Sequence, residues 1–398
     1  MMKGALSDVK VLDLTRVLSG PYAGMWLGDL GADVVKIEVP GKGDDARFTP
    51  PHVNGFSTFF AAINRNKRSI TLNLKAPEGK EIFLKMVEKA DVVLANFRPG
   101  VMERLGLGYD ELSRINPGII YAVISGFGQE GPYAQRPAYD AVAQGMGGIM
   151  ALTGMEGSDP TRVGASIADI TAGINTVVGI LAALHARTLT GRGQYIDVAM
   201  VDSVLALTPS ETNRYFYTGF PNKRLGNRYI GNSPYGAFRS KNGMFILACG
   251  SDKLFARFCN DVLERPELAT DERFALMVNR SNNHEELKKI VEDWSTRYTT
   301  AELVDKLLSK GVPAGPVFDS DDIAHDEHIV GVRDMLPEID QPEVGKFHVI
   351  NNPIKMSDTK TEIRRPAPRL GEHNSEVYNE WLGLDEKELN ALKERGII

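Results

Sequence analysis

The feature that most constrains the fold is a regular alternation of short apolar runs with helical segments over residues 9–200. The runs are rich in Val and Ile, and we expect strands at residues 9–14, 34–38, 70–74, 92–97, 119–125 and 195–200. Helices are expected between them at residues 21–30, 77–90, 109–115 and 168–190. Such alternation predicts an α/β fold with a parallel sheet covered on both faces and a ligand at the carboxyl ends of its strands.

A change in composition predicts a second domain. A chain of 398 residues is longer than one ordinary compact core, and Tyr, Asn, Gly and Pro crowd together at residues 215–234, where the periodicity disappears. We therefore expect a large domain over residues 1–214, a linker with a smaller α/β domain over 215–330, and a C-terminal segment, 331–398, that returns to the large domain.

Charge and cysteine content exclude several functional classes. The formal net charge of -6 gives no long-range attraction for nucleic acid or an anionic membrane, so we expect neither partner. Cys249 and Cys259 are too few for a disulfide framework and form no C-x-x-C pair. The N-terminal residues have no signal-peptide pattern, and the apolar run at 174–184 is shorter than a membrane span. We expect a cytoplasmic protein.

Two motifs have a cofactor or metal interpretation beside a plainer one. Gly126, Gly128 and Gly131 have the spacing of a dinucleotide fingerprint, but Pro132 follows and a loop continues where the fingerprint requires a helix. We expect a glycine-rich loop over a crevice. The HDEH sequence at 325–328 has metal-ligand residue types, but no further ligand is indicated elsewhere, and solvated charges at a helix start explain it. We expect no metal.

Charged residues near expected strand ends and helix starts are candidate functional groups. Lys75, Arg98 and Arg104 lie at or beyond the ends of two expected strands, where cations could hold phosphates, although surface charge is the simpler explanation. Asp169 begins an apolar helix and Asp140 precedes an apolar run, so both have the placement of helix-capping acids. Residue chemistry alone does not decide between capping and catalysis.

Several segments occur together in one order: VLDLTRVLSGP, LGADVVKIE, NRNKRSITLNLKAPEGKE, DVVLANFRPGVMERLGLGY, SGFGQEGPY, YDAVAQGMGG, RVGASIAD, LAALHARTLTGRGQYIDVAM, GVPAGPV and LGEHNSEV. Over nearly its whole length the chain thereby resembles the class III CoA-transferase family, also called CaiB/BaiF or formyl-CoA transferase-like. The resemblance implies a Rossmann-like large domain, a smaller domain, and a homodimer of interlocked subunits. It also implies transfer of CoA from an acyl-CoA thioester to a free carboxylic acid, with CoA as part of the substrate and no permanently bound cofactor.

The resemblance assigns roles to individual residues of this chain. Asp169, in GASIAD, falls at the position of the family's nucleophile, with Tyr139 and Asp140 as further catalytic residues. The CoA-binding positions fall on Val17, Leu18, Leu72, Lys75, Asn96, Phe97, Arg98 and Arg104. The implied route is an aspartyl-acyl anhydride and then an aspartyl-CoA thioester on Asp169. Backbone N–H groups at 145–148 or near Gly231 could stabilise the tetrahedral intermediates.

Departures from the family's oxalate branch bear on the substrate. Leu18 stands where those enzymes carry glutamine, Val39 stands where they carry a basic residue, and no run of glycines occurs in 224–243. We therefore expect an acceptor other than oxalate, for example a dicarboxylate used with succinyl-CoA. Arg16 and Arg47 could engage its second carboxylate, and contact with CoA or solvent is an equal alternative.

Two other functions stay open at this stage. The α-methylacyl-CoA racemases are similar in sequence but use a catalytic histidine where this chain has Tyr139, and a tyrosine is poorly suited to shuttle protons at neutral pH. The third class is a nucleotide-binding module or dehydrogenase without acyl chemistry. Retention of NAD rather than CoA on purification would favour that class.

Overall fold

The structure, a computed structural model, describes residues 4–398. The chain forms two compact units. One comprises the residues up to 149 together with 162–218 and 328–398, and the other comprises 150–161 and 219–327. The first unit is therefore built from three separate stretches of the chain, and its last stretch is the C-terminal one.

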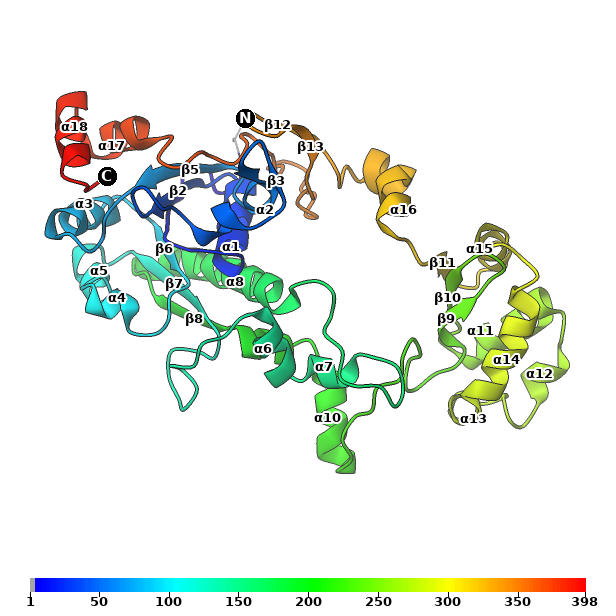
Figure 1. Cartoon of the computed structure of the whole chain (residues 1–398). Coiled ribbons are helices and arrows are strands. Elements are labelled where there is room, and N and C mark those ends of the chain that lie inside the picture. Colours follow the sequence, from blue (N-terminus) through cyan, green and yellow to red (C-terminus); the bar gives the residue numbers. More distant parts are fainter. Residues whose placement is uncertain (1–3) are drawn as a thin grey trace. The chain divides into compact units, whose positions relative to one another are not determined.

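A six-stranded parallel sheet forms the centre of the first unit (Figure 1). The strands are β1 (Lys10–Asp13), β2 (Asp33–Glu38), β5 (Lys67–Thr71), β6 (Val92–Ala95), β7 (Ile120–Ser125) and β8 (Tyr195–Ala199). Their order is β5-β2-β1-β6-β7-β8, and every neighbouring pair is parallel. The expected α/β fold with a parallel sheet is confirmed. The chain moves from β1 outward to β2 and β5 and then returns to β6 on the other side of β1, so the order reverses between β1 and β6. Ligands of such sheets bind beyond the carboxyl ends of the strands at this reversal.

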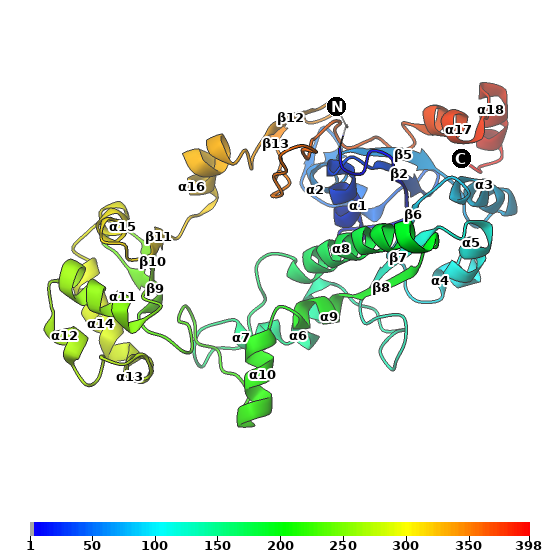
Figure 2. The ribbon, with the colours of Figure 1, turned by 180° about the vertical axis from the view of Figure 1, so that it is seen from behind.

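Helices cover both faces of the sheet. The helices of the first unit are α1 (Ser19–Asp29), α2 (Thr58–Ile63), α3 (Pro77–Val87), α4 (Val101–Arg104), α5 (Tyr109–Ile115), α6 (Asp140–Met146), α8 (Ile167–Thr190), α9 (Met200–Leu205), α10 (Pro209–Thr218), α17 (Asn374–Leu382) and α18 (Glu386–Glu394). On one face, Val11 and Val34 join a buried cluster with α1 and α8, which lie next to each other in Figure 2. On the other face, Leu12 and Val35 join a cluster with α3, α5, α17 and α18. The alternation of buried side chains along each strand thus gives each face its own core.

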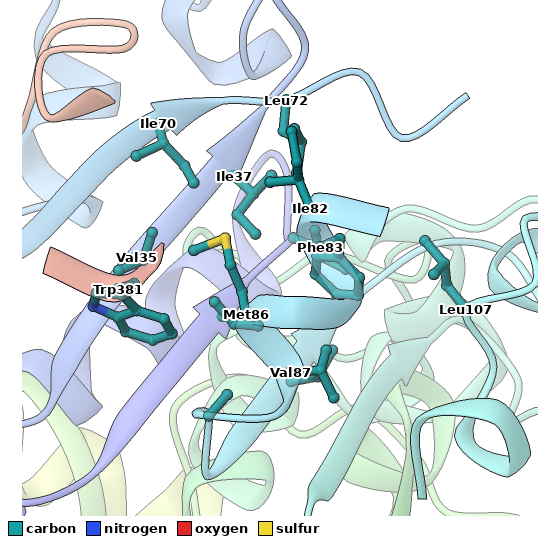
Figure 3. Close-up of a cluster of buried hydrophobic side chains, with 14 of the residues drawn as sticks. Val35, Ile37, Ile70, Leu72, Ile82, Phe83, Met86, Val87, Leu107 and Trp381 are labelled. Atoms are coloured by element: carbon teal, nitrogen blue, oxygen red, sulfur yellow. The ribbon is translucent and has the colours of Figure 1, made fainter. Parts of the chain in front are cut away.

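The C-terminal helices complete the second of these clusters. Trp381 of α17 lies among side chains of the sheet and of α3, as Figure 3 shows with Val35 and Met86. The hydroxyl of Tyr378 donates a hydrogen bond of 2.7 Å to the carbonyl of Thr71, at the end of β5. Both aromatic side chains are fully buried. The segment after residue 330 is therefore part of the core of the first unit.

The second unit is a smaller α/β arrangement. Its strands are β9 (Tyr235–Arg239), β10 (Met244–Ala248) and β11 (Ala314–Pro316), paired antiparallel in the order β11-β10-β9. Its helical segments are α11 (Asp252–Arg257), η2 (Phe258–Leu263), α12 (Glu267–Thr270), α13 (Met277–Asn282), α14 (His284–Ser295), α15 (Thr300–Ser309) and α16 (Ser320–His325). Phe238 and Phe245 of the strands pack with Phe255, Phe258 and Leu303 in a separate core.

Short elements complete the description. They are the turn η1 (Asp45–Phe48), α7 (Ile149–Leu152), η3 (Glu327–Val332), and the hairpins β3 (His52–Val53) with β4 (Phe56–Ser57) and β12 (Glu338–Gln341) with β13 (Gly345–His348). The HDEH sequence spans the end of one helical segment and the start of the next: α16 ends at His325, Asp326 is extended, and η3 begins at Glu327. Among residues 4–398, no three His, Cys, Asp or Glu side chains are grouped closely enough to hold a metal ion.

α8 has almost the bounds expected for the helix at 168–190, but it is apolar over more of its length than the run at 174–184 indicated. Its 24 residues meet the length and composition of a membrane span. Ala172, Val177 and Ile180 are nevertheless buried in the first unit, and the amide of Asn175 donates to the hydroxyl of Ser203 on α9. This packing places one face of α8 in the core of the first unit. Gly173 allows it, because a Cβ at that position would lie 2.8 Å from the carbonyl oxygen of Ser19 on α1.

Candidate active site

The loop that follows β1 lies at the reversal of strand order and is held by side chains from two neighbouring loops. Asn96, directly after β6, accepts from the backbone N–H of Arg16 at 2.9 Å and donates to the carbonyl of Arg16 at 2.7 Å. The carboxylate of Asp44 accepts from the N–H of Val17 at 3.0 Å. Val17 has a φ of 66°, which is unfavourable for a β-branched residue. These hydrogen bonds fix the loop in a conformation that it would not adopt unaided.

A buried ion pair supports this loop from below. Lys36 of β2 lies 2.8 Å from the carboxylate of Asp44 and donates a 2.8 Å hydrogen bond to the carbonyl of Thr15. Burial opposes ionisation of Asp44, but the charge of Lys36 and the hydrogen bond from Ala46 outweigh it and hold the pKa of Asp44 below its ordinary value. The pair therefore stays charged and anchors both ends of the loop.

Asp169 stands in a cavity of about 300 Å³ at this loop. It occupies the first turn of α8 and lines the cavity together with Ser19, where α1 begins. Burial, and then the negative charge of Asp140, raise the pKa of Asp169 to about 7, while a hydrogen bond from the Ser19 hydroxyl acts in the opposite direction. The amide of Asn96 lies 3.4 Å from the same hydroxyl oxygen. Ser19 thus accepts from Asn96 and donates to Asp169.

Asp140 holds the helix that carries Asp169. One of its carboxylate oxygens accepts from the N–H of Ala168 at 2.9 Å, and the other accepts from the amide of Gln144 at 2.7 Å. Gln144 is fully buried and also accepts from the N–H of Val163 at 2.9 Å. A carboxylate at the N-terminus of α8 satisfies an N–H that lacks a partner within the helix. Asp140 therefore has the capping geometry that its placement suggested, but on α8 rather than on its own helix.

A second cavity of about 360 Å³ adjoins the same loop. It shares Arg16 and Phe97 with the first cavity. Positive charge in its lining comes from Lys75 and from Lys42, which is paired with Asp45 at 3.0 Å. Two cavities with common lining residues suit an elongated ligand, and cations suit its phosphate groups.

The structure brings most of the residues suggested by the resemblance to these cavities. Val17, Leu18, Asn96, Phe97, Arg98, Tyr139 and Asp169 line the first cavity, and Leu72, Lys75 and Phe97 line the second. Tyr139 is at the rim, 74% exposed. Asp140 lies behind the first cavity, and the exposed Arg104 lines neither, although its neighbours Val101 and Leu105 line the second.

Two groups suggested from the sequence do not line the first cavity. The guanidinium of Arg47 is committed to Glu38 at 2.6 Å and to the carbonyl of Pro368 at 3.0 Å, and it does not line the first cavity. The guanidinium of Arg47 is therefore engaged within the chain. Residues 145–148 belong to the end of α6 and the turn after it, and they do not line that cavity either.

Sequence reasoning missed five residues of the site: Ser19, Lys42, Asp44, Arg136 and Gln144. Ser19 and Arg136 line the first cavity and Lys42 lines the second. Asp44 and Gln144 act through the backbone of residues distant along the chain. Ser19 lies in the S-G-P turn after the first expected strand. Its position beyond a strand end could have identified it as a residue of the site.

Comparison with known proteins gives a consistent result. A profile of the family described as CoA-transferase family III matches residues 6–374. The chain is 42% identical to acetyl-CoA:oxalate CoA-transferase of Acetobacter aceti, over 97% of this chain and 98% of that protein. It is 41% identical to succinyl-CoA:mesaconate CoA-transferase of Haloarcula marismortui, over 96% and 97%, and 36% identical to succinyl-CoA:glutarate CoA-transferase of Homo sapiens, over 99% and 90%.

A solved structure agrees with these relatives. The crystal structure of a CAIB/BAIF family protein from Brucella suis matches with a TM-score of 0.84 and 38% identity, over 96% of this chain and 100% of that one. The family resemblance inferred from the sequence is confirmed. The chain belongs to CoA-transferase family III and is an enzyme that transfers CoA between an acyl-CoA thioester and a carboxylic acid.

Proposed function

We propose that Asp169 is the covalent carrier in this transfer and that the acyl groups include dicarboxylic acids. The observation that carries the proposal is the setting of Asp169: a half-buried carboxyl with its pKa raised to about 7, in a cavity at the reversal of strand order. A carboxylate with a raised pKa is a stronger nucleophile than an ordinary one and is still substantially ionised near neutral pH.

CoA occupies the two adjoining cavities in this proposal. Lys75 and Lys42 suit the phosphates in the second cavity, and Phe97, shared by both, suits the pantetheine chain between them. Arg98 is exposed and directly follows Phe97, so it adds positive charge on the same side. The thioester then reaches Asp169 in the first cavity.

The chemistry conserves the thioester through two covalent intermediates. A carboxylate oxygen of Asp169 bonds to the thioester carbonyl carbon, the C–S bond breaks, and CoA leaves as the thiolate, which gives a mixed anhydride. The thiolate then attacks the side-chain carbonyl of Asp169, releases the donor acid as a carboxylate and leaves an aspartyl-CoA thioester. An acceptor carboxylate reverses both steps, so no net proton or external energy source is needed.

The start of α1 can stabilise the oxyanion of each tetrahedral intermediate. No side chain caps this helix, and the first N–H groups of a helix have no acceptor within it. Leu18 and Ser19 line the cavity beside Asp169. Backbone N–H groups at this point are donors of the type that developing oxyanions require.

The test is covalent trapping. After incubation with acyl-CoA and treatment with hydroxylamine or borohydride, mass spectrometry should locate the modification at Asp169 alone. Asp169→Asn should lose transfer by on the order of 10³-fold or more, as expected for removal of a covalent nucleophile, whereas Asp202→Asn, on the exposed side of α9, should retain it. Trapping at another residue, or full activity in Asp169→Asn, would refute the proposal.

The acceptor proposal is supported by the relatives and by Leu18. Two relatives named above act with succinyl-CoA on mesaconate or glutarate, both dicarboxylic acids, and apolar Leu18 lines the cavity of Asp169. One relative acts on oxalate, so oxalate belongs in the comparison. Catalytic efficiencies should favour a longer dicarboxylate, and a preference for oxalate would contradict the argument from Leu18.

We also propose that the enzyme is a homodimer with interlocked subunits. Support comes from α10, which buries no residue and exposes 75% of Phe216 and 89% of Tyr217, and from α8, which exposes 76% of Leu189. Such apolar surfaces are typical of protein interfaces. Sedimentation should give a dimer that does not dissociate on dilution, because interlocked chains separate only by unfolding. A monomer at any concentration with native structure would exclude the interlocked form.

A further inference from the structure

The loop between β7 and α6 presents an arginine on an aromatic stack. The ring of Phe127 meets that of Tyr133 edge to face, with centroids 5.9 Å apart. The guanidinium carbon of Arg136 lies 3.9 Å from the ring centroid of Tyr133. The backbone N–H of Arg136 donates a hydrogen bond to the backbone carbonyl of Tyr133 at 2.9 Å. The stack fixes one face of the guanidinium and leaves the N–H groups at its edge available.

The start of this loop is fastened to β8 and α9, and its end packs against its start. At one end, a Cβ on Gly126 would lie 2.3 Å from the Cβ of Ala138, so only glycine allows the two chain segments to approach. The carbonyl of Gly126 accepts from the N–H of Val201 at 3.1 Å, and the carboxylate of Asp197 accepts from the N–H of Gln129 at 2.9 Å. Arg136 is therefore presented by a fastened loop.

Arg136 is also the cation of the first cavity that is best placed for the acyl group. It lines that cavity together with Asp169 and Tyr139 but does not line the second cavity. Arg98 also lines only the first cavity, but it directly follows Phe97, which both cavities share. Arg16 is committed to Asp45 at 3.0 Å and lines both cavities. Within residues 4–398, the interaction found for the Arg136 guanidinium is the contact with Tyr133, and no carboxylate of the chain neutralises it.

We propose that Arg136 binds the distal carboxylate of a dicarboxylic acyl group whose other carboxyl reacts at Asp169, an inference that rests on the proposed function. A planar guanidinium held by stacking offers paired N–H donors to a carboxylate in a fixed plane. The CoA phosphates have their own cations on the side of Phe97. Arg136 thus selects dicarboxylic over monocarboxylic acids at the site where donor and acceptor acyl groups react in turn.

The experiment compares acids that differ only at the distal end. With acetyl-CoA as the donor, which has no second carboxylate, the acceptors are succinate against butyrate and glutarate against pentanoate. In Arg136→Gln, kcat/KM for the dicarboxylates should fall by about 10- to 100-fold, the range expected for loss of a charge-assisted hydrogen bond. For the monocarboxylates it should stay within about twofold or rise. Arg136→Lys should recover part of the loss, and Tyr133→Leu should weaken the selectivity.

Arg98→Gln is the matched control, because it removes a cation from the CoA side and should raise the KM for acyl-CoA equally with every acceptor. Arg136→Gln should still form the covalent adduct at Asp169, which separates this inference from the proposed function. Equal losses for both kinds of acid in Arg136→Gln, or no change for either, would overturn the role of Arg136. A wild-type enzyme that trapped Asp169 yet showed no preference for dicarboxylates would also overturn it.

Discussion

Asp169 is kept partly protonated near neutral pH by its surroundings. Burial and the charge of Asp140 raise its pKa to about 7, and the Ser19 hydroxyl opposes them. Only the ionised form can attack a thioester. The three groups together set the pH at which the nucleophile becomes available.

The pH dependence of kcat/KM should therefore follow this carboxyl. The rate should rise with pH and reach half of its plateau near pH 7, as the pKa of about 7 requires. Asp140→Asn removes a negative charge and should move the midpoint to lower pH, whereas Ser19→Ala removes a donor and should move it to higher pH. Profiles of the three proteins, measured with one acyl-CoA, check this. Shifts in the same direction for both variants would contradict it.

The same carboxyl should destabilise the folded chain at high pH. Its pKa is about 7 in the folded chain and 3.8 without the fold, so the folded chain binds the proton more tightly. The resulting stability is present below pH 4 and is lost as pH rises toward 7. Asp169→Asn should then increase the free energy of unfolding at pH 8 by up to about 4 kcal/mol, at about 1.36 kcal/mol per pKa unit, and change it little at pH 4. Urea unfolding at both values is the measurement, and an equal effect at both would speak against the raised pKa.

At the scale of the elements, the N-terminus of α8 is held by a side chain of another helix. Gln144 connects Asp140, which accepts from Ala168, to the backbone of Val163. The position of Asp169 therefore depends on an amide that makes no contact with the substrate in our proposal. Gln144 is a positioning residue.

Gln144→Leu tests this dependence at nearly constant volume. It leaves the N–H of Val163 without a partner and removes the hydrogen bond to Asp140, whose Oδ2 keeps the ion pair with Arg162 at 3.9 Å. This should lower stability by about 1–3 kcal/mol. It should lower kcat far more than it raises the KM for acyl-CoA, because α8 carries the nucleophile but not the CoA phosphate ligands. Gln144→Glu, which restores an acceptor for Val163 but not a donor, should recover only part of kcat. An unchanged kcat in a folded Gln144→Leu enzyme would show that the contact is only structural.

The elements of the large sheet could be predicted because their runs of Val and Ile are buried on both faces, as parallel sheets require. β5 begins at Lys67 rather than at the expected residue 70, because Lys67 and Arg68 are buried through their pairing with Asp13 and Asp33. Polar strand residues of this kind give no periodic signal.

The residues of the site also fall into those that could be predicted from the sequence and those that could not. Asp169, Phe97 and Arg98 could be placed near one cavity from strand ends and from the family resemblance. The roles of Asn96, Asp44 and Gln144 could not, because each acts on the backbone of a loop that is distant in the sequence. The ion pair of Arg47 with Glu38 could not be predicted either. From the sequence alone, its guanidinium had no assigned partner.

For the molecule as a whole, the core of the first unit depends on its last stretch. Trp381 is 1% exposed and fills a cluster made by the sheet and α3, and its indole N–H has no hydrogen-bond partner in the part of the chain that the structure describes. Trp381→Ala should destabilise the enzyme by about 3–5 kcal/mol. Trp381→Phe should cost clearly less, because it removes less volume from the core and, like the alanine variant, breaks no hydrogen bond of the indole. Thermal unfolding of both variants checks the order, and equal losses would contradict it.

The joining of α17 to the sheet also has a consequence for synthesis. Residues 10–125 supply five of the six strands of the sheet, but Trp381 and Tyr378 leave the ribosome only after the entire second unit has been made. Until then, the part of the cluster around Leu12, Val35 and Ile70 that α17 and α18 cover stays open to chaperones and proteases. The core of the first unit can therefore be completed only after synthesis of α17 and α18. A chain truncated before residue 374 should be degraded by the cell rather than accumulate as a shortened enzyme.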